Sequence, residues 1–130
     1  MGSEMCIRDR LLGISTGKSR RGLDAIFASH DIAPFFDTVW CADDGPGKPH
    51  PFMCLEAMGE VGAEPSQTLM IGDAVHDMRM ARAAGVRAFG VTWGFGRADE
   101  LHKAGAHEVF NSFEDLNTAL EIFRVSKPNL

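Results

Sequence analysis

The segment from Met70 to Asp77 places two acidic side chains where an apolar run gives way to a helical pattern. The apolar run, Thr68 to Ile71, leads through one glycine into Asp73, and Asp77 follows four residues later. If a strand ends just before Asp73, both carboxylates lie at a strand-to-helix junction, where open α/β sheets bind ligands. Paired carboxylate oxygens suit a hard cation such as Mg²⁺. The same acids could instead cap the helix and complement its dipole, and this segment alone leaves both interpretations open.

Two earlier segments carry further side chains that could contact a charged ligand. Leu11 to Ser15 is an apolar run followed by the hydroxyl of Thr16 and by Gly17. Gly45 to Pro51 is a loop rich in glycine and proline that holds Lys48 just ahead of a helical pattern. Taken singly, Thr16 could cap the next helix and Lys48 could be an ordinary solvated lysine.

A hydroxyl, a lysine and an acidic pair, in this order on successive strand-to-helix turns, resemble the haloacid dehalogenase superfamily of phosphatases. Thr16 matches the second motif of that superfamily, Lys48 the third, and Gly72-Asp73…Asp77 the fourth. The resemblance covers roughly Leu11 to Phe123. Two short segments are similar to the phosphoglycolate-phosphatase-like branch of the superfamily: Ala42-Asp43-Asp44-Gly45 and Trp93-Gly94-Phe95-Gly96.

The first motif of the family, an Asp-x-Asp-Gly-Thr-type sequence that supplies the nucleophile, has no match in this chain. The helical cap of this branch is also missing, so the chain resembles the C-terminal portion of a phosphatase. Residues 1–10 look foreign to the fold, because Met5-Cys6-Ile7-Arg8-Asp9-Arg10 resembles translated sequencing-adaptor read-through. We therefore expect a non-native extension over residues 1–10, a partial hydrolase core over 11–124 and a polar tail over 125–130.

The resemblance implies the chemistry of a phosphoric monoester hydrolase. An intact relative would form an aspartyl-phosphate from a small phosphorylated metabolite, phosphoglycolate being one candidate, with Mg²⁺ bridging carboxylate and phosphoryl oxygens. Thr16, Lys48 and Asp73 would be catalytic, and Thr16, Gly17 and Lys48 would bind phosphate. Asp73 would be the main metal ligand, and Asp77 would bind through water or orient the ligands. Without a nucleophile, the 130-residue chain is expected to be inactive alone.

Two other hypotheses compete with the phosphatase. Gly13 to Ser19 resembles a phosphate-binding P-loop, but only three residues separate Gly13 from the Gly17-Lys18 pair, where that motif needs four. The chain could also be a folded, catalytically dead domain that binds Mg²⁺ or a partner. A strand carrying Asp-x-Asp upstream in the gene would distinguish these alternatives.

The composition of the chain limits the kinds of partner that we expect the protein to bind. With 130 residues and 45% hydrophobic residues, the chain has the size of one globular domain. Its 13 basic and 18 acidic residues give a net charge of −5, which argues against nucleic acids and anionic membranes. Cys6, Cys41 and Cys54 have no metal-ligand spacing and are expected to be reduced thiols. No apolar run approaches the roughly 18 residues of a membrane span, so we expect a cytoplasmic protein of undetermined oligomeric state.

The hydrophobic pattern predicts an α/β fold, a three-layer doubly wound parallel sheet. Helices are expected at Ser19 to Ser29, from Pro51 to Gly62 with Phe52, Leu55 and Met58 recurring every three residues, and from Val75 to a C-terminal Gly85. Two more are expected at Ala98 to Ala104 and at the end, where Phe113, Leu116, Leu120 and Phe123 are buried. Strands are expected at Leu11 to Ser15, Thr38 to Cys41, Thr68 to Ile71, Arg87 to Val91 and, at an edge, His107 to Phe110.

The family order of strands adds one expectation. The missing first strand would be central, with the strands that end near Thr16 and Ile71 as its neighbours. The remaining elements should therefore leave a gap in the sheet, bordered by two rows of unpaired backbone groups.

Overall fold

The computed structural model describes residues 11–126, in which strands and helices alternate along the chain. The expectations for residues 1–10 and 127–130 lie outside this range. The strands are β1 (Gly13–Ser15), β2 (Thr38–Trp40), β3 (Leu69–Gly72), β4 (Arg87–Val91) and β5 (Glu108–Phe110). The helices are α1 (Arg20–His30), α2 (Phe52–Val61), α3 (Val75–Ala84), α4 (Ala98–Lys103) and α5 (Phe113–Ser126), with short 3₁₀ turns at Ala33–Phe35, Ala42–Asp44 and Pro65–Gln67. The polar tail predicted from residue 125 is therefore helical as far as Ser126.

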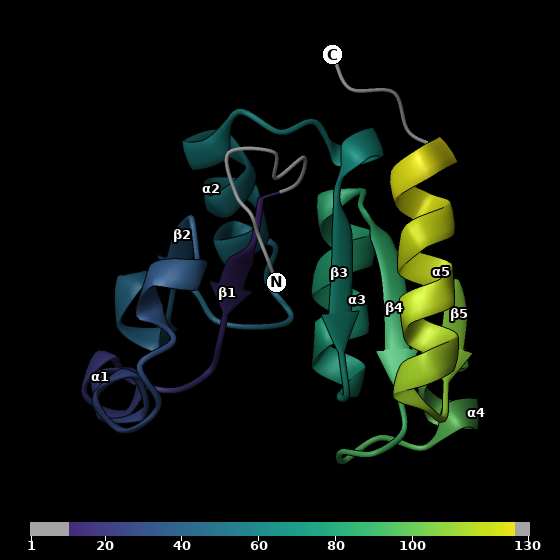
Figure 1. The fold of residues 1–130 in the computed structure, drawn as a ribbon, viewed down its shortest axis with the longest axis horizontal. Coiled ribbons are helices and arrows are strands. Elements are labelled where there is room, and N and C mark those ends of the chain that lie inside the picture. Colours follow the sequence, from purple (N-terminus) through teal and green to yellow (C-terminus); the bar gives the residue numbers. More distant parts are fainter. Residues whose placement is uncertain (1–10, 127–130) are drawn as a thin grey trace.

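All the strand pairs are parallel, which confirms the predicted α/β class. They form a two-stranded sheet, β1–β2, and a three-stranded sheet, β3–β4–β5, with β5 at an edge as expected. Figure 1 shows the two sheets side by side, with β1 and β3 pointing in the same direction. Among the described residues no strand lies between β1 and β3, and a cavity is lined by both of them. The gap expected from the family order is present.

Local signals in the sequence set the ends of the helices. Ser19 begins α1, because its Oγ accepts a hydrogen bond of 3.1 Å from the N–H of Gly22. Two helices end at glycines with a left-handed backbone, α2 at Gly62 with φ +71° and α3 at Gly85 with φ +78°. Glycine takes this conformation without steric cost, so the predicted helix ends are confirmed.

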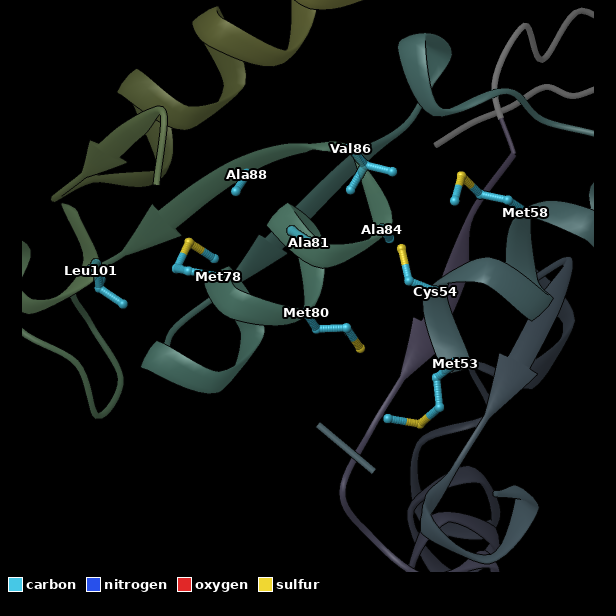
Figure 2. Packing of buried hydrophobic residues seen from close by; sticks show 10 residues of the cluster. All are labelled: Met53, Cys54, Met58, Met78, Met80, Ala81, Ala84, Val86, Ala88 and Leu101. Carbon is cyan, nitrogen blue, oxygen red and sulfur yellow. The ribbon is translucent and has the colours of Figure 1, made fainter. Parts of the chain in front are cut away.

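The core lies in two clusters on opposite faces of β4. Ala88 belongs to the larger cluster, which also contains side chains of α2 and α3, whereas Phe89 and Val91 pack with Leu116 of α5. Because consecutive residues of a strand point to opposite faces, this alternation puts helices on both sides of the sheet in three layers. In Figure 2 Met80 of α3 points towards Met53 and Cys54 of α2, whereas Met78 lies on the side of Leu101.

Leu55, one of the recurring apolar residues of α2, and Phe113, which was predicted to be buried, are both exposed. Leu55 in α2 is 45% exposed, and the helix buries Met53 and Cys54 instead. A spacing of three residues drifts around a helix with 3.6 residues per turn, so a stripe with that spacing does not stay on one face. Phe113, the first residue of α5, is 66% exposed and stacks on Trp93, with ring centroids 4.7 Å apart. It lies at the end of the helix, beyond the face that packs on β4.

In residues 11–126 no helix combines the length and the apolar character that crossing a membrane requires.

Candidate functional site

Lys48 and Asp77 form an ion pair at the start of α3. The Nζ of Lys48 donates to Oδ1 of Asp77, and the two side chains are only 20% and 8% exposed. The other carboxylate oxygen, Oδ2, accepts a bond of 3.2 Å from the N–H of Ala74. Asp77 therefore bonds to the backbone at the start of α3, as one of the two interpretations expected, and its other carboxylate oxygen pairs with the ammonium of Lys48.

Glycine brings α3 close to the end of β3. A Cβ placed at Gly72 would overlap the side chain of Asp77, so only glycine leaves room for the carboxylate at this position. Asp73 comes next, at the carboxyl end of β3, where parallel sheets place their ligands. Glycine is therefore required directly before Asp73, because the side chain of Asp77 occupies the space that a Cβ at this position would need.

The loop after β4 holds Asp73 in place. The N–H of Phe95 donates to Oδ2 of Asp73 at 3.3 Å, and the N–H of Gly96 donates to its backbone oxygen at 2.7 Å. A Cβ at Gly94 would overlap the Asp73 carboxyl group, so this loop needs glycine where it crosses the aspartate. From the sequence, this loop was noted only because Trp93-Gly94-Phe95-Gly96 is similar to one branch of the phosphatase family. Its alternating glycines were the available signal for a close contact.

A second carboxylate organises the loop that precedes Lys48. Asp44 accepts bonds of 2.7 Å from the N–H of Cys41 and 2.9 Å from the guanidinium of Arg20. The backbone bond from Cys41, assisted by Arg20, lowers the pKa of Asp44 below its usual value. A Cβ at Gly45 would overlap the ring of Phe52, so the chain turns closely over the start of α2. These contacts fix the loop from which Lys48 reaches Asp77.

Thr16 follows β1 in the other sheet. Its N–H donates to the backbone oxygen of Trp40 at 3.0 Å, and its Oγ1 accepts from the N–H of Lys18 at 3.1 Å. Gly17 is exposed, and a Cβ there would meet no atom within 4 Å. Within residues 11–126 no hydrogen bond or ion pair joins Thr16 to Lys48, Asp73 or Asp77.

The described residues do not form a magnesium site of their own. Nowhere in residues 11–126 do three or more His, Cys, Asp or Glu side chains gather so that they could hold a metal ion. Asp77 already bonds to Lys48 and to Ala74, and Asp73 to Phe95. Because Mg²⁺ requires six oxygen ligands in near-octahedral geometry, these carboxylates would need further ligands from elsewhere.

Curated proteins with sequences similar to this chain include phosphatases. "Probable phosphatase IndB" of Dickeya dadantii is 37% identical over 106 residues, which are 81% of this chain and 46% of that protein. The phosphoglycolate phosphatase of Salmonella typhimurium is 34% identical over 110 residues, 84% of this chain and 44% of the relative. The chain thus spans about half the length of the curated relatives it matches.

Solved structures agree with this similarity. A conserved haloacid dehalogenase-like protein of Agrobacterium tumefaciens superposes with a TM-score of 0.78 at 27% identity, over 93% of this chain and 56% of the other. CbbY of Rhodobacter sphaeroides, solved with xylulose 1,5-bisphosphate, gives a TM-score of 0.71 at 25% identity, over 82% and 48% of the two chains.

A family model described as haloacid dehalogenase-like hydrolase matches residues 7–91, well over half of the chain. Together with the parallel α/β fold and the phosphatase relatives, this match shows that the chain belongs to the haloacid dehalogenase-like hydrolases.

Proposed function

We propose that this chain supplies part of the active site of a Mg²⁺-dependent phosphoric monoester hydrolase. The observation that supports the proposal is the arrangement of Lys48, Asp73 and Asp77 around one strand-to-helix junction. In this arrangement one cation and two carboxylates lie at the carboxyl end of β3. Such an arrangement can receive the charge of a phosphoryl group and of the metal that accompanies it.

Lys48 would neutralise negative charge during phosphoryl transfer. Its ammonium is a compact point charge with three donors, and the bond to Asp77 fixes its position. A phosphate oxygen nearby could accept one of the remaining protons. Held in a half-buried site, such a cation stabilises developing charge more strongly than it would in water.

Thr16 and Gly17 would bind the phosphoryl oxygens. The hydroxyl of Thr16 accepts a bond from Lys18, and a hydroxyl that accepts in this way keeps its own proton to donate. The open space around Gly17 would allow a phosphate to approach the backbone closely. These two residues follow β1 of the β1–β2 sheet, so substrate would contact residues at the ends of both sheets.

Magnesium would join the site only with ligands that residues 11–126 do not provide. For the chain alone we propose weak binding, with a Kd on the order of millimolar, that depends on Asp73. Titration calorimetry with MgCl₂ on the wild type, Asp73→Asn and the control Asp99→Asn, at an exposed position of α4, would measure it. Equal heats in all three proteins would remove Asp73 from the set of metal ligands.

The proposed substrate is a small phosphate monoester, with phosphoglycolate as the first candidate. The support is the similarity to phosphoglycolate phosphatases, of which the one from Escherichia coli K12 is 32% identical over 110 residues. For the 130-residue chain alone we propose no turnover, because none of the residues assigned here would act as the nucleophile. In that state it would be a catalytically inactive domain of the family.

The decisive experiment adds a nucleophile and a cap to the chain. A fusion that adds an upstream strand with an Asp-x-Asp pair and a helical cap should hydrolyse phosphate monoesters in a Mg²⁺-dependent manner. Lys48→Ala and Asp73→Asn should abolish this activity, whereas the exposed control Lys18→Ala should retain most of it. An active Lys48→Ala fusion, or robust hydrolysis by the 130-residue chain alone, would contradict the proposal.

A further inference from the structure

The turns that follow β1 and β2 stay joined to each other beyond the two strands. The strands pair along their whole length, so both end at the same level. Beyond them, the N–H of Thr16 donates to the backbone oxygen of Trp40 at 3.0 Å, and the N–H of Ala42 donates to the backbone oxygen of Lys18 at 3.0 Å. The turn that carries Thr16 is therefore attached to the turn that leads to Lys48.

Two adjacent acids in the second turn bond to the first residue of α1. Oδ2 of Asp43 accepts from the backbone N–H of Arg20 at 2.7 Å. The guanidinium of Arg20 donates to both carboxylate oxygens of Asp44, at 2.9 and 3.2 Å. The first N–H groups of a helix have no partner within the helix, so Asp43 supplies one for α1. Arg20 is thus held through its backbone and through its side chain, and we call Arg20, Asp43 and Asp44 the clip.

Asp44 also connects the clip to the loop of Lys48. Gly45, the next residue, lies so close to the ring of Phe52 that a Cβ would overlap it. A backbone hydrogen bond of 3.0 Å closes a turn over residues 47–50, which include the lysine. Only three residues separate Asp44 from Lys48, so a shift of the clip is transmitted to the lysine.

The charge of the two acids indicates that they act on the protein and not on a ligand. Phosphate is an anion, so a carboxylate close to its site repels it. Asp43 and Asp44 nevertheless lie in the turn that is joined to the turn of Thr16. The hydrogen bonds described for them go to backbone N–H groups and to the guanidinium of Arg20. Their place next to an anion site is explained if their task is to hold its two turns together.

We propose that Arg20, Asp43 and Asp44 are positioning residues, which fix Lys48 relative to Thr16. The inference rests on the proposed function, in which the hydroxyl of Thr16 and the ammonium of Lys48 contact one phosphoryl group. A phosphoryl group can bond to both only when their separation matches its size, and placement errors of about 1 Å are costly in such sites. The clip would set this separation in advance, before any ligand binds.

The first test needs no ligand and uses the complete 130-residue chain. Urea unfolding gives the factor by which Lys48→Met raises the unfolding equilibrium constant, in the wild type and in Asp44→Ala. This factor should be smaller in Asp44→Ala by roughly threefold or more, because the displaced lysine pairs less well with Asp77. Asp24→Asn, which removes an exposed acid of α1 near Arg20, is the matched control and should leave the factor unchanged. Arg20→Met gives the same comparison if Asp44→Ala does not fold, and equal factors in all backgrounds would overturn the inference.

The second test separates positioning from simple charge effects. Inorganic phosphate is titrated into the isotope-labelled chain, and the NMR shifts of the Gly17 and Lys48 amides give its affinity. Asp44→Ala removes a negative charge and Arg20→Met a positive one, so charge alone would change the affinity in opposite directions. Positioning predicts that both variants bind phosphate more weakly, by roughly fivefold or more. Asp24→Asn, which also removes a negative charge, should bind phosphate at least as tightly as the wild type.

The outcomes distinguish this inference from the proposed function. Opposite changes in Asp44→Ala and Arg20→Met, or affinities equal to that of the wild type, would overturn the role of the clip and leave the phosphate site in place. If the wild type binds no phosphate, the roles proposed for Thr16, Gly17 and Lys48 fail. The unfolding experiment then decides by itself whether the clip positions Lys48, since it involves no ligand.

Discussion

Lys48 and Asp77 form an ion pair that links the two halves of the molecule. Lys48 precedes α2, on the side of the β1–β2 sheet, and Asp77 lies in the first turn of α3, next to the β3–β4–β5 sheet. Met53 and Cys54 of α2 and Met80 of α3 also belong to one apolar cluster (Figure 2). Polar and apolar contacts between these helices therefore hold the two sheets in a fixed relation despite the gap between them.

Removing the cation should destabilise the fold measurably. In Lys48→Met the carboxylate of Asp77, only 8% exposed, keeps the N–H of Ala74 but loses its counter-ion. We expect the free energy of unfolding in urea to fall by about 2 kcal/mol, less than for a fully buried pair because Lys48 is partly exposed. The matched control is Arg97→Met, which breaks an ion pair with Asp99 between side chains 76% and 61% exposed and should have almost no effect. Similar losses in the two variants would show that Lys48 has no special structural role.

A methyl group at residue 94 should disturb Asp73. The Cβ of Gly94→Ala would overlap the Asp73 carboxyl group, so the loop or the aspartate must move. We expect a loss of about 1–3 kcal/mol in unfolding free energy and faster amide exchange at Phe95, whose N–H bonds to that carboxylate. Gly59→Ala is the control, because a Cβ there meets nothing within 4 Å and alanine favours the helix by up to about 1 kcal/mol. An unchanged Phe95 amide in Gly94→Ala would contradict the steric argument.

Truncation of α2 should show which face of the helix is buried. Met53 is fully buried, so Met53→Ala should cost about 2–5 kcal/mol through lost contacts and a residual cavity. Leu55 is 45% exposed, so Leu55→Ala should change stability by less than about 1 kcal/mol. Urea unfolding of both variants measures the difference. The reverse order would contradict the burial of Met53 and the exposure of Leu55 described here.

Local signals predicted the elements of this fold well. The strand from Arg87 to Val91 has the predicted bounds, and α3 ends at Gly85, because hydrophobic alternation and a left-handed glycine act within a few residues. The family order of strands also predicted that no strand of residues 11–126 lies between β1 and β3. These features need no knowledge of distant contacts.

The errors have a different origin. Whether Leu55 is buried depends on how α2 rotates against α3, and the exposure of Phe113 depends on its stacking with Trp93, twenty residues earlier. The bond from Phe95 to Asp73 likewise spans 22 residues. Such contacts are set by packing in three dimensions, which the pattern of one segment cannot reveal.

His107 should make the stability of the fold depend on pH. Burial, with the nearby charges of Arg82 and Arg87, lowers the pKa of His107 below its ordinary value of 6.5. Its Nδ1 also accepts a bond of 3.0 Å from the N–H of Ala88, which requires this nitrogen to be unprotonated. Because the unfolded chain binds the proton more readily, the contribution of His107 is complete above about pH 6.5 and is lost as pH falls through the folded pKa.

The free energy of unfolding, measured in urea, should therefore fall as the pH is lowered from 7.5 to 5. The contribution of His107 is the difference between the wild type and His107→Asn. Asparagine keeps an acceptor for the Ala88 N–H but does not titrate, and the decline should be shallower in this variant. If the free energy of unfolding falls equally with pH in the wild type and in His107→Asn, protonation of this histidine is not coupled to folding.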